Sequence, residues 1–185
     1  MKYTLLQSAE ATITLKETKE YLAIDHEYHD EMLRRLIKAA IRYSENYTGM
    51  SVTERRWKVE ATPAEMGVGF ILAYQPVVEI DYIETIIDTK WTQIEKSQYV
   101  FHESETSSFI QVCDHVLLSN AQENGQIFRV GFHVNPEPLS DALHQAVIMI
   151  VAWYYENRGD VASEYNNAIP PEISALLESE RKGFL

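Results

Sequence analysis

In the N-terminal part of the chain, hydrophobic and polar residues recur with the period of an α-helix over two successive stretches. Thr14 precedes Glu17 by three residues, the spacing of a capping box in which the hydroxyl and the carboxylate each accept a backbone N–H. This predicts a short helix over 15–22. A longer amphipathic helix begins after Asp25 and ends at Gly49, because glycine readily adopts the left-handed conformation of a helix end. The apolar face of the longer helix consists of Leu33, Leu36, Ile37, Ala40, Ile41 and Tyr47, and its polar face of Arg34, Arg35, Lys38, Arg42 and Glu45.

In the middle of the chain, over 52–134, the pattern changes to short runs of β-branched and aromatic residues. Turn-forming residues such as Pro63, Gly67 and Gly125 separate these runs. Such a pattern is typical of antiparallel β-structure. The predicted strands are 55–61, 69–72, 77–87, 98–101, 108–112 and 126–134.

The C-terminal part returns to a helical pattern. Pro136 and Pro138 end the last strand and favour a helix start, which predicts a long helix over 139–157. One stripe of that helix is apolar, and five further residues extend the apolar surface almost all the way round: Ile148, Met149, Ala152, Trp153 and Tyr155. A helix that is apolar on every side must be covered on every side, either by its own chain or by a neighbouring subunit. A short helix is predicted over 172–179, and the chain ends in two apolar residues.

These elements together predict an α+β fold with one domain overall. Its helical core would contain N-terminal helices over 1–51 and a long core helix over 135–159. A β-rich insertion would occupy 52–134, and a C-terminal arm with a short helix would occupy 160–185.

Length and composition fit one globular domain without a membrane span. The chain has 185 residues, of which 45% are hydrophobic, enough for one sizeable core. The longest unbroken apolar stretch, 146–155, is half of the roughly 20 residues that a transmembrane helix needs. Polar residues interrupt the N-terminus before any signal-peptide core develops, so we expect synthesis in the cytoplasm.

The net charge of −12 opposes general binding to a phosphate backbone, which requires clustered lysine and arginine. The ordinary interpretation of this charge is solubility. A functional interpretation is compatible with it: an acidic surface repels DNA and lets DNA slide past without adhering.

The histidines offer one weak candidate for a metal site. His26 and His29 are three residues apart, which can place two imidazoles on one face of a helix. The acidic residues around them favour the other interpretation, a solvated helix start that suits the positive end of the helix dipole. The remaining candidates, which lie in different predicted strands and receive no role, are His102, His115 and His133.

No pattern of catalytic residues is recognisable. Cys113 is the only cysteine, carries no nucleophile signature around it, and is expected to pack as a small hydrophobic residue. Gly67-Val68-Gly69 lacks the third glycine and the following helix of a dinucleotide loop. Carboxylates are frequent in the β region, at Glu60, Glu65, Glu79, Asp81 and Glu84, but nothing selects a pair. We therefore predict no catalytic residue, no metal, no cofactor and no enzymatic activity.

Segments near both ends of the chain carry a recognisable pattern. The N-terminal part of the pattern consists of ITLKE at 13–17, YLAID at 21–25, LRRLIKAA at 33–40 and ENYTG at 45–49. The C-terminal part consists of LHQAVIMIVAWYYENR at 143–158 and IPPEISALL at 169–177. The N-terminal part resembles the signature of phage and prophage head-tail connector proteins, the gp6-like adaptor family, and the C-terminal part is similar to the last long helix and the closing element of that family. From the first to the last residue of each part, these segments span 13–49, 143–158 and 169–177, about a third of the chain, in the family's order.

The resemblance implies a structural virion protein, assembled in the bacterial host cytoplasm and located in the virion neck. Identical copies would form a ring of about a dozen around the DNA channel, with head-to-tail contacts closing the circle. The ring would bind the portal on one side and a tail-side stopper or tail terminator on the other, with DNA only as passing cargo. The residues expected at the subunit interface are Ile148, Met149, Ala152, Trp153 and Tyr155, and those expected to dock to the portal are Ile173, Leu176, Leu177, Phe184 and Leu185.

Three alternatives remain open. The first is a tail-completion or stopper protein, although such proteins are usually more completely β. The second is an enzyme whose site residues meet only in the fold. The third is a regulatory binding domain, and the absence of a basic helix argues against it.

Overall fold

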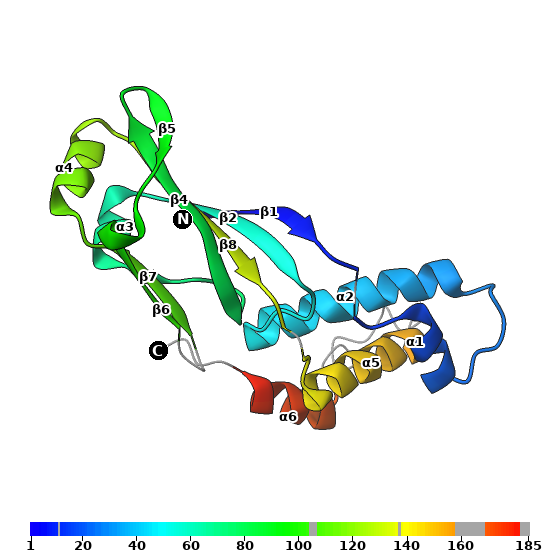
Figure 1. The fold of residues 1–185 in the computed structure, drawn as a ribbon. Helices are drawn as coiled ribbons and strands as arrows, with labels where there is room; N and C mark the ends of the chain where they lie inside the picture. Colours follow the sequence, from blue (N-terminus) through cyan, green and yellow to red (C-terminus); the bar gives the residue numbers. More distant parts are fainter. Residues whose placement is uncertain (11, 104–106, 137, 158–168, 182–185) are drawn as a thin grey trace. The chain divides into compact units, whose positions relative to one another are not determined.

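The computed structural model describes residues 1–10, 12–103, 107–136, 138–157 and 169–181, which form two compact units (Figure 1). The described residues of the β unit lie within Met1–Glu10 and Thr53–Pro136, and those of the helical unit within Ala11–Val52 and Glu137–Lys182. Each unit is therefore built from segments that are far apart in the sequence. The combination of helices with antiparallel sheets confirms the predicted α+β class.

The β unit contains two antiparallel sheets. The larger has the order β1-β2-β8-β4-β5, with the strands β1 (Lys2–Ser8), β2 (Arg55–Ala61), β8 (Phe128–Val134), β4 (Val77–Ile87) and β5 (Lys90–Gln93). The smaller has the order β3-β7-β6, with β3 (Phe70–Ile71), β7 (Ser108–Val112) and β6 (Tyr99–Glu103). Two helices and a single 3-10 turn join these strands: α3 (Pro63–Val68), α4 (His115–Glu123) and η1 (Lys96–Gln98).

Alternation along the central strand β8 places its apolar side chains in the core of the β unit. Phe128, Val130, Phe132 and Val134 are fully buried, whereas the intervening polar residues are partly exposed on the other face. Buried residues of the neighbouring strands and of the two short helices complete this core: Val59, Ala61, Ile83, Met66 and Ala121.

The helical unit contains α1 (Leu15–Tyr21), α2 (Asp30–Thr48), α5 (Asp141–Glu156) and α6 (Pro171–Glu180). The Thr14 hydroxyl caps α1 by accepting the Glu17 N–H, and Gly49 ends α2 with a φ of 72°, as the sequence predicted. The Glu17 carboxylate does not complete a capping box, since it lies 3.2 Å from the ring of His144 on α5. Helices α2, α5 and α6 supply most of the buried core of this unit, and the partly buried Leu15 of α1 packs against it. The buried residues include Leu33, Ile37, Ala40, Leu143, Val147, Ile150, Ile173 and Leu177.

The element boundaries confirm most of the predicted pattern and correct three parts of it. Strands β2, β4 and β7 have the predicted bounds, and the long helices begin and end within a few residues of prediction. The segment Lys2–Ser8 is strand β1, although the sequence pattern placed it with the N-terminal helices. Helices α3 and α4 interrupt the region predicted as continuous β-structure, so His115 begins a helix and does not lie in a strand.

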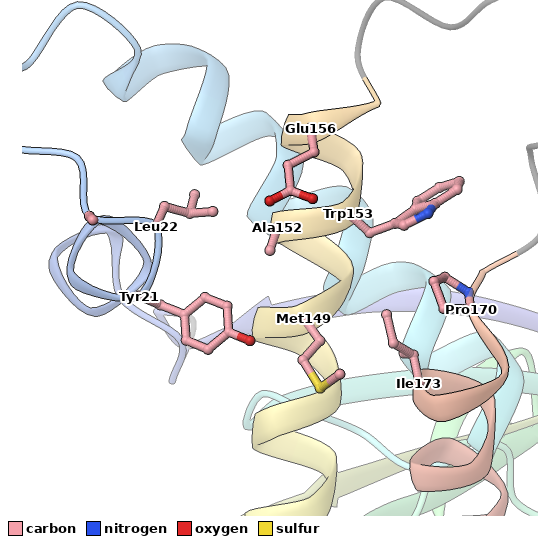
Figure 2. Close-up of a pocket in the computed structure, with 9 residues that line it drawn as sticks. Tyr21, Leu22, Met149, Ala152, Trp153, Glu156, Pro170 and Ile173 are labelled. Carbon is pink, nitrogen blue, oxygen red and sulfur yellow. The ribbon is translucent and has the colours of Figure 1, made fainter.

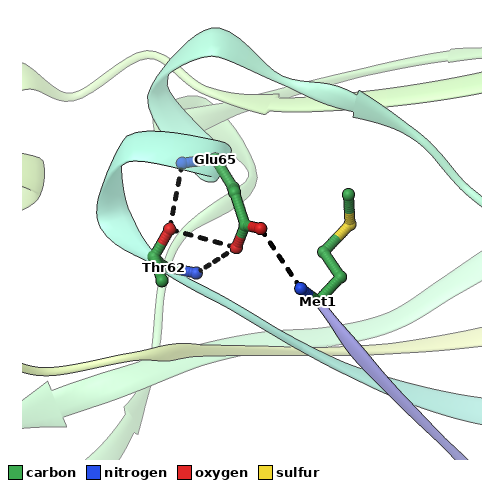
Figure 3. A network of polar contacts seen from close by, with 3 residues as sticks. All are labelled: Met1, Thr62 and Glu65. Carbon is green, nitrogen blue, oxygen red and sulfur yellow. Dashed lines mark hydrogen bonds and ion pairs between the residues drawn. The ribbon is translucent and has the colours of Figure 1, made fainter.

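A complete capping box starts α3 (Figure 3). The Thr62 hydroxyl accepts the Glu65 N–H at 3.3 Å, and the Glu65 carboxylate accepts the Thr62 N–H at 2.7 Å. The terminal ammonium of Met1 lies 3.2 Å from the same carboxylate. The hydrogen bond from the Thr62 backbone is the main cause that lowers the pKa of Glu65.

The lowered pKa of Glu65 predicts a pH-dependent contribution to stability. A carboxylate whose folded-state pKa lies below its unfolded value stabilises the fold above the unfolded pKa, and loses this contribution as pH falls through the folded pKa. We expect Glu65→Gln to lower the free energy of unfolding at neutral pH, and this deficit to shrink as the pH falls below the unfolded pKa of a glutamate and the carboxyl becomes protonated. Urea unfolding over a series of pH values from neutral to acidic measures this, with the exposed Glu123→Gln as control. A deficit of the Glu65 variant that persists unchanged in acid contradicts the prediction.

Gly131 predicts a steric constraint in β8. A Cβ atom at this position would lie 2.6 Å from Tyr82 Cζ, because the tyrosine ring of β4 packs directly over the glycine. We expect Gly131→Ala to lower the free energy of unfolding by about 1–3 kcal/mol through overpacking. Urea denaturation of the single variants and of Gly131→Ala with Tyr82→Ala tests the cause. The second substitution should recover part of the loss, and strictly additive effects would contradict the clash.

Candidate functional site

The helical unit carries a groove of about 350 Å³ between three of its helices (Figure 2). Met149 and Ala152 of α5 form its floor. Tyr21 and Leu22 at the end of α1 stand on one side, and Pro170 and Ile173 at the start of α6 on the other. The remaining lining residues are Ala23, Trp153 and Glu156.

Local sequence explains why the three helices leave this space. Met149, Trp153 and Glu156 are spaced by four and three residues, so they project from one face of α5. Helix α1 ends at Tyr21 and the chain turns at Ala23, which has a φ of 52°. Pro170 and Pro171 fix the start of α6, because proline is tolerated only in the first turn. Among the residues that the structure describes, no helix therefore extends over the C-terminal half of α5 on this side.

The chemistry of the groove suits a protein side chain better than a reaction. Its walls are apolar and aromatic, with Tyr21 49% exposed, and it contains one carboxylate, that of the exposed Glu156. Among the described residues, no cluster of histidine, cysteine or carboxylate side chains could hold a metal ion. The groove offers apolar contact, aromatic faces and one negative charge.

The structure separates the five residues that the sequence placed at a subunit interface. Met149, Ala152 and Trp153 line the groove together. Ile148 is only 4% exposed and packs inside its own unit, which leaves little of its side chain for a neighbour. The Tyr155 hydroxyl lies 2.6 Å from Nδ1 of His29, on another side of α5.

The residues predicted to dock to the portal are better anchored than the sequence suggested. Ile173 and Leu177 are 3% and 0% exposed in the core of the helical unit, and Leu176 is partly buried. Helix α6 is therefore anchored in its own unit through Ile173 and Leu177. Phe184 and Leu185 lie outside the residues that the structure describes.

The other candidate residues do not converge on a second site. The rings of His26 and His29 are 5.0 Å apart, but no third metal ligand joins them in the described part of the chain. Cys113 is exposed and does not pack in the core, contrary to the prediction. His102 lies in β6 and His133 in β8, where Nε2 of His133 is 2.7 Å from the Glu54 carboxylate.

Three carboxylates of the β region, those of Glu60, Asp81 and Glu84, are paired with arginine and do not form an acid–base pair. Glu60 and Glu84 flank Arg129 at 3.4 and 3.7 Å, and a hydrogen bond from Lys58 is the main cause that lowers the pKa of Glu60. Asp81 binds Arg56. These contacts form a row of paired charged side chains on the face of the larger sheet.

The exposed face of α2 is basic, which corrects the expectation that the chain has no basic helix. Arg34, Arg35, Lys38 and Arg42 are all exposed on it. Glu31, which lies 3.7 Å from Arg35, is the one carboxylate on this face. None of the helices in the described part of the chain is long and apolar enough to cross a membrane.

Comparisons with known proteins give one family and one fold. The sequence profile of the family described as head completion protein matches residues 11–182. A chain from the neck of an empty gene transfer agent (GTA) particle, computed with C6 symmetry, has 19% identity and a TM-score of 0.79 over 100% of this chain and 97% of that one. A search of curated proteins found no match.

Two further solved structures share the fold. A chain from the virion of the native GTA particle has 20% identity and a TM-score of 0.79, covering 100% of this chain and 97% of that one. A chain from the neck of the native GTA particle, computed with C12 symmetry, has 19% identity and a TM-score of 0.67, with 97% of each chain covered.

The burial of α6 predicts that two neighbouring leucines have different roles. Leu177→Ala should lower the free energy of unfolding by about 2–5 kcal/mol, because it leaves a cavity in a closed core. Leu176→Ala is the matched control and should cost clearly less, since Leu176 keeps part of its surface in solvent. Equilibrium denaturation of both variants measures the difference, and equal losses would mean that α6 does not anchor through Leu177.

Proposed function

Because the chain belongs to the head completion protein family, a structural protein of the head-tail connector type, we propose that its copies form a ring in the neck of a phage-like particle. The family match confirms the resemblance to head-tail connectors that the sequence indicated. The proposed role is structural: the chain joins a filled head to a tail and catalyses no reaction.

The observation that carries this proposal is the family match over residues 11–182, which includes every element of the helical unit. The fold similarity supports it, because the similar chains come from necks computed with C6 and C12 symmetry. Cyclic symmetry brings identical copies side by side around an axis, and each copy then presents two different surfaces to its neighbours.

The proposed partners follow from this position. Each copy contacts two others, and the ring binds the portal on the head side and a stopper or tail terminator on the tail side, with DNA as passing cargo. We assign Met149, Ala152 and Trp153 to the contact between copies, since the groove exposes part of their apolar surface. We propose that Leu176, Phe184 and Leu185 dock to the portal. Ile173 and Leu177 are buried, so their contribution is to hold α6 in position.

A gene deletion tests the proposed function directly. In a bacterium that makes the particle, loss of the chain should give heads and tails that fail to join, because the part that connects them is missing. Electron microscopy of lysates counts joined particles, and a plasmid copy of the wild-type gene should restore them. Particles that join normally without the chain would contradict a role in the neck.

A further inference from the structure

The polar face of α2 is a second surface that the described residues of the helical unit leave uncovered. Arg34, Lys38 and Arg42 are spaced by four residues and form a stripe about 12 Å long, at 1.5 Å of rise per residue. All three are exposed, and no ion pair engages them among the residues that the structure describes. These cations stand out in a chain whose net charge is −12.

The stripe and the groove lie on opposite sides of the helical unit. The buried face of α2 packs with Leu143, Val147 and Ile150 of α5, so the exposed face of α2 points away from α5. The groove residues Met149 and Trp153 project from the other side of α5, and α2 passes behind that helix when the groove is seen from the front (Figure 2). In a head-to-tail ring, two neighbouring copies meet through surfaces placed in this way.

The groove has the chemistry that recognises arginine. An arginine buries its aliphatic stem on apolar surface and places its guanidinium against aromatic faces and carboxylates. Met149 and Ala152 supply the apolar floor, Tyr21 and Trp153 the aromatic faces, and Glu156 the carboxylate. From Met149 to Glu156 the groove follows α5 for about 10 Å, close to the length of the stripe.

The β unit shows the same recognition within one chain. The guanidinium carbon of Arg129 lies 3.6 Å above the ring of Trp91, and the carboxylates of Glu60 and Glu84 lie within 4 Å of its nitrogens. An arginine between an aromatic face and carboxylates is thus an arrangement that this sequence already uses.

We infer that the groove of one copy receives arginine side chains from the α2 stripe of the next copy in the ring. The inference rests on the proposed function, since it names the surfaces through which neighbouring copies meet. Glu156 pairs with Arg34 or Arg42 of the adjacent copy, while Trp153 and Tyr21 stack against the guanidinium. The contact is heterologous, so it closes a circle and does not stop at a dimer.

Charge reversal and its rescue test this contact. In the deletion strain, the plasmid carries either the double variant Arg34→Glu with Arg42→Glu or the single variant Glu156→Arg. Each should lower the fraction of joined particles at least about tenfold relative to the wild-type plasmid, as expected when close charge pairs at an interface are broken. Combining Glu156→Arg with one of the two arginine reversals should restore joining, because the pair is then reversed in every interface of the ring. Matched reversals in the β unit, Lys96→Glu and Glu123→Arg, should have little effect. Circular dichroism melting of the purified variants checks that each one folds.

The outcomes separate this inference from the proposed function. Normal joining without the chain overturns both. If the deletion strain fails to join and wild type restores it, the function stands. The inference is then overturned if the reversals have no effect, or if neither combination with Glu156→Arg restores joining. Loss from Glu156→Arg with none from the arginine reversals would assign the groove to another occupant.

Discussion

The apolar circumference of α5 is the constraint on which the helical unit depends. Leu143, Val147, Ile150 and Val151 are fully covered, and no single neighbouring helix can cover a helix that is apolar on several sides. Helices α1 and α2 precede the β unit in the sequence and α6 follows α5, yet all of them contribute to the same core. The helical core therefore joins segments that precede and follow the strands β2 to β8 in the sequence. These strands form the β unit together with β1, which precedes α1 and pairs with β2.

The described residues cover α5 completely on the side of α2 and incompletely on the opposite side. Helix α6 begins only at Pro171 and anchors through Ile173 and Leu177, so it covers one flank of α5. Helix α1 ends at Tyr21, and what remains between the two is the groove. A packed interior tolerates few voids, whereas a groove that opens to the surface leaves space that another molecule can fill. The incomplete covering is thus the link between the fold and the proposed ring.

Sequence pattern sufficed for elements with a strong period and failed for short ones. The alternating run of β4 and the amphipathic face of α2 are long enough for both elements to be recognised from the sequence alone. The start of α3 carried a clear signal, Thr62-Pro63 followed by Glu65, but a helix of six residues shows no period, and its proline and glycine suggested turns. Three of the nine groove residues were foreseen as an interface. The groove itself was not, because α1, α5 and α6 meet only in the fold.

Charge explains why the two proposed contact surfaces should be so unlike each other. Identical copies with a net charge of −12 repel one another unless cations and carboxylates meet where the copies touch. A closed ring of head-to-tail contacts gives each copy one surface of each kind, so a single basic stripe and a single carboxylate-bearing groove are sufficient for every interface. Pairing the α2 cations inside the contacts also leaves the acidic residues in excess on the remaining surface. In a ring of this kind, the excess of acidic residues outside the contacts opposes adhesion of DNA to those surfaces.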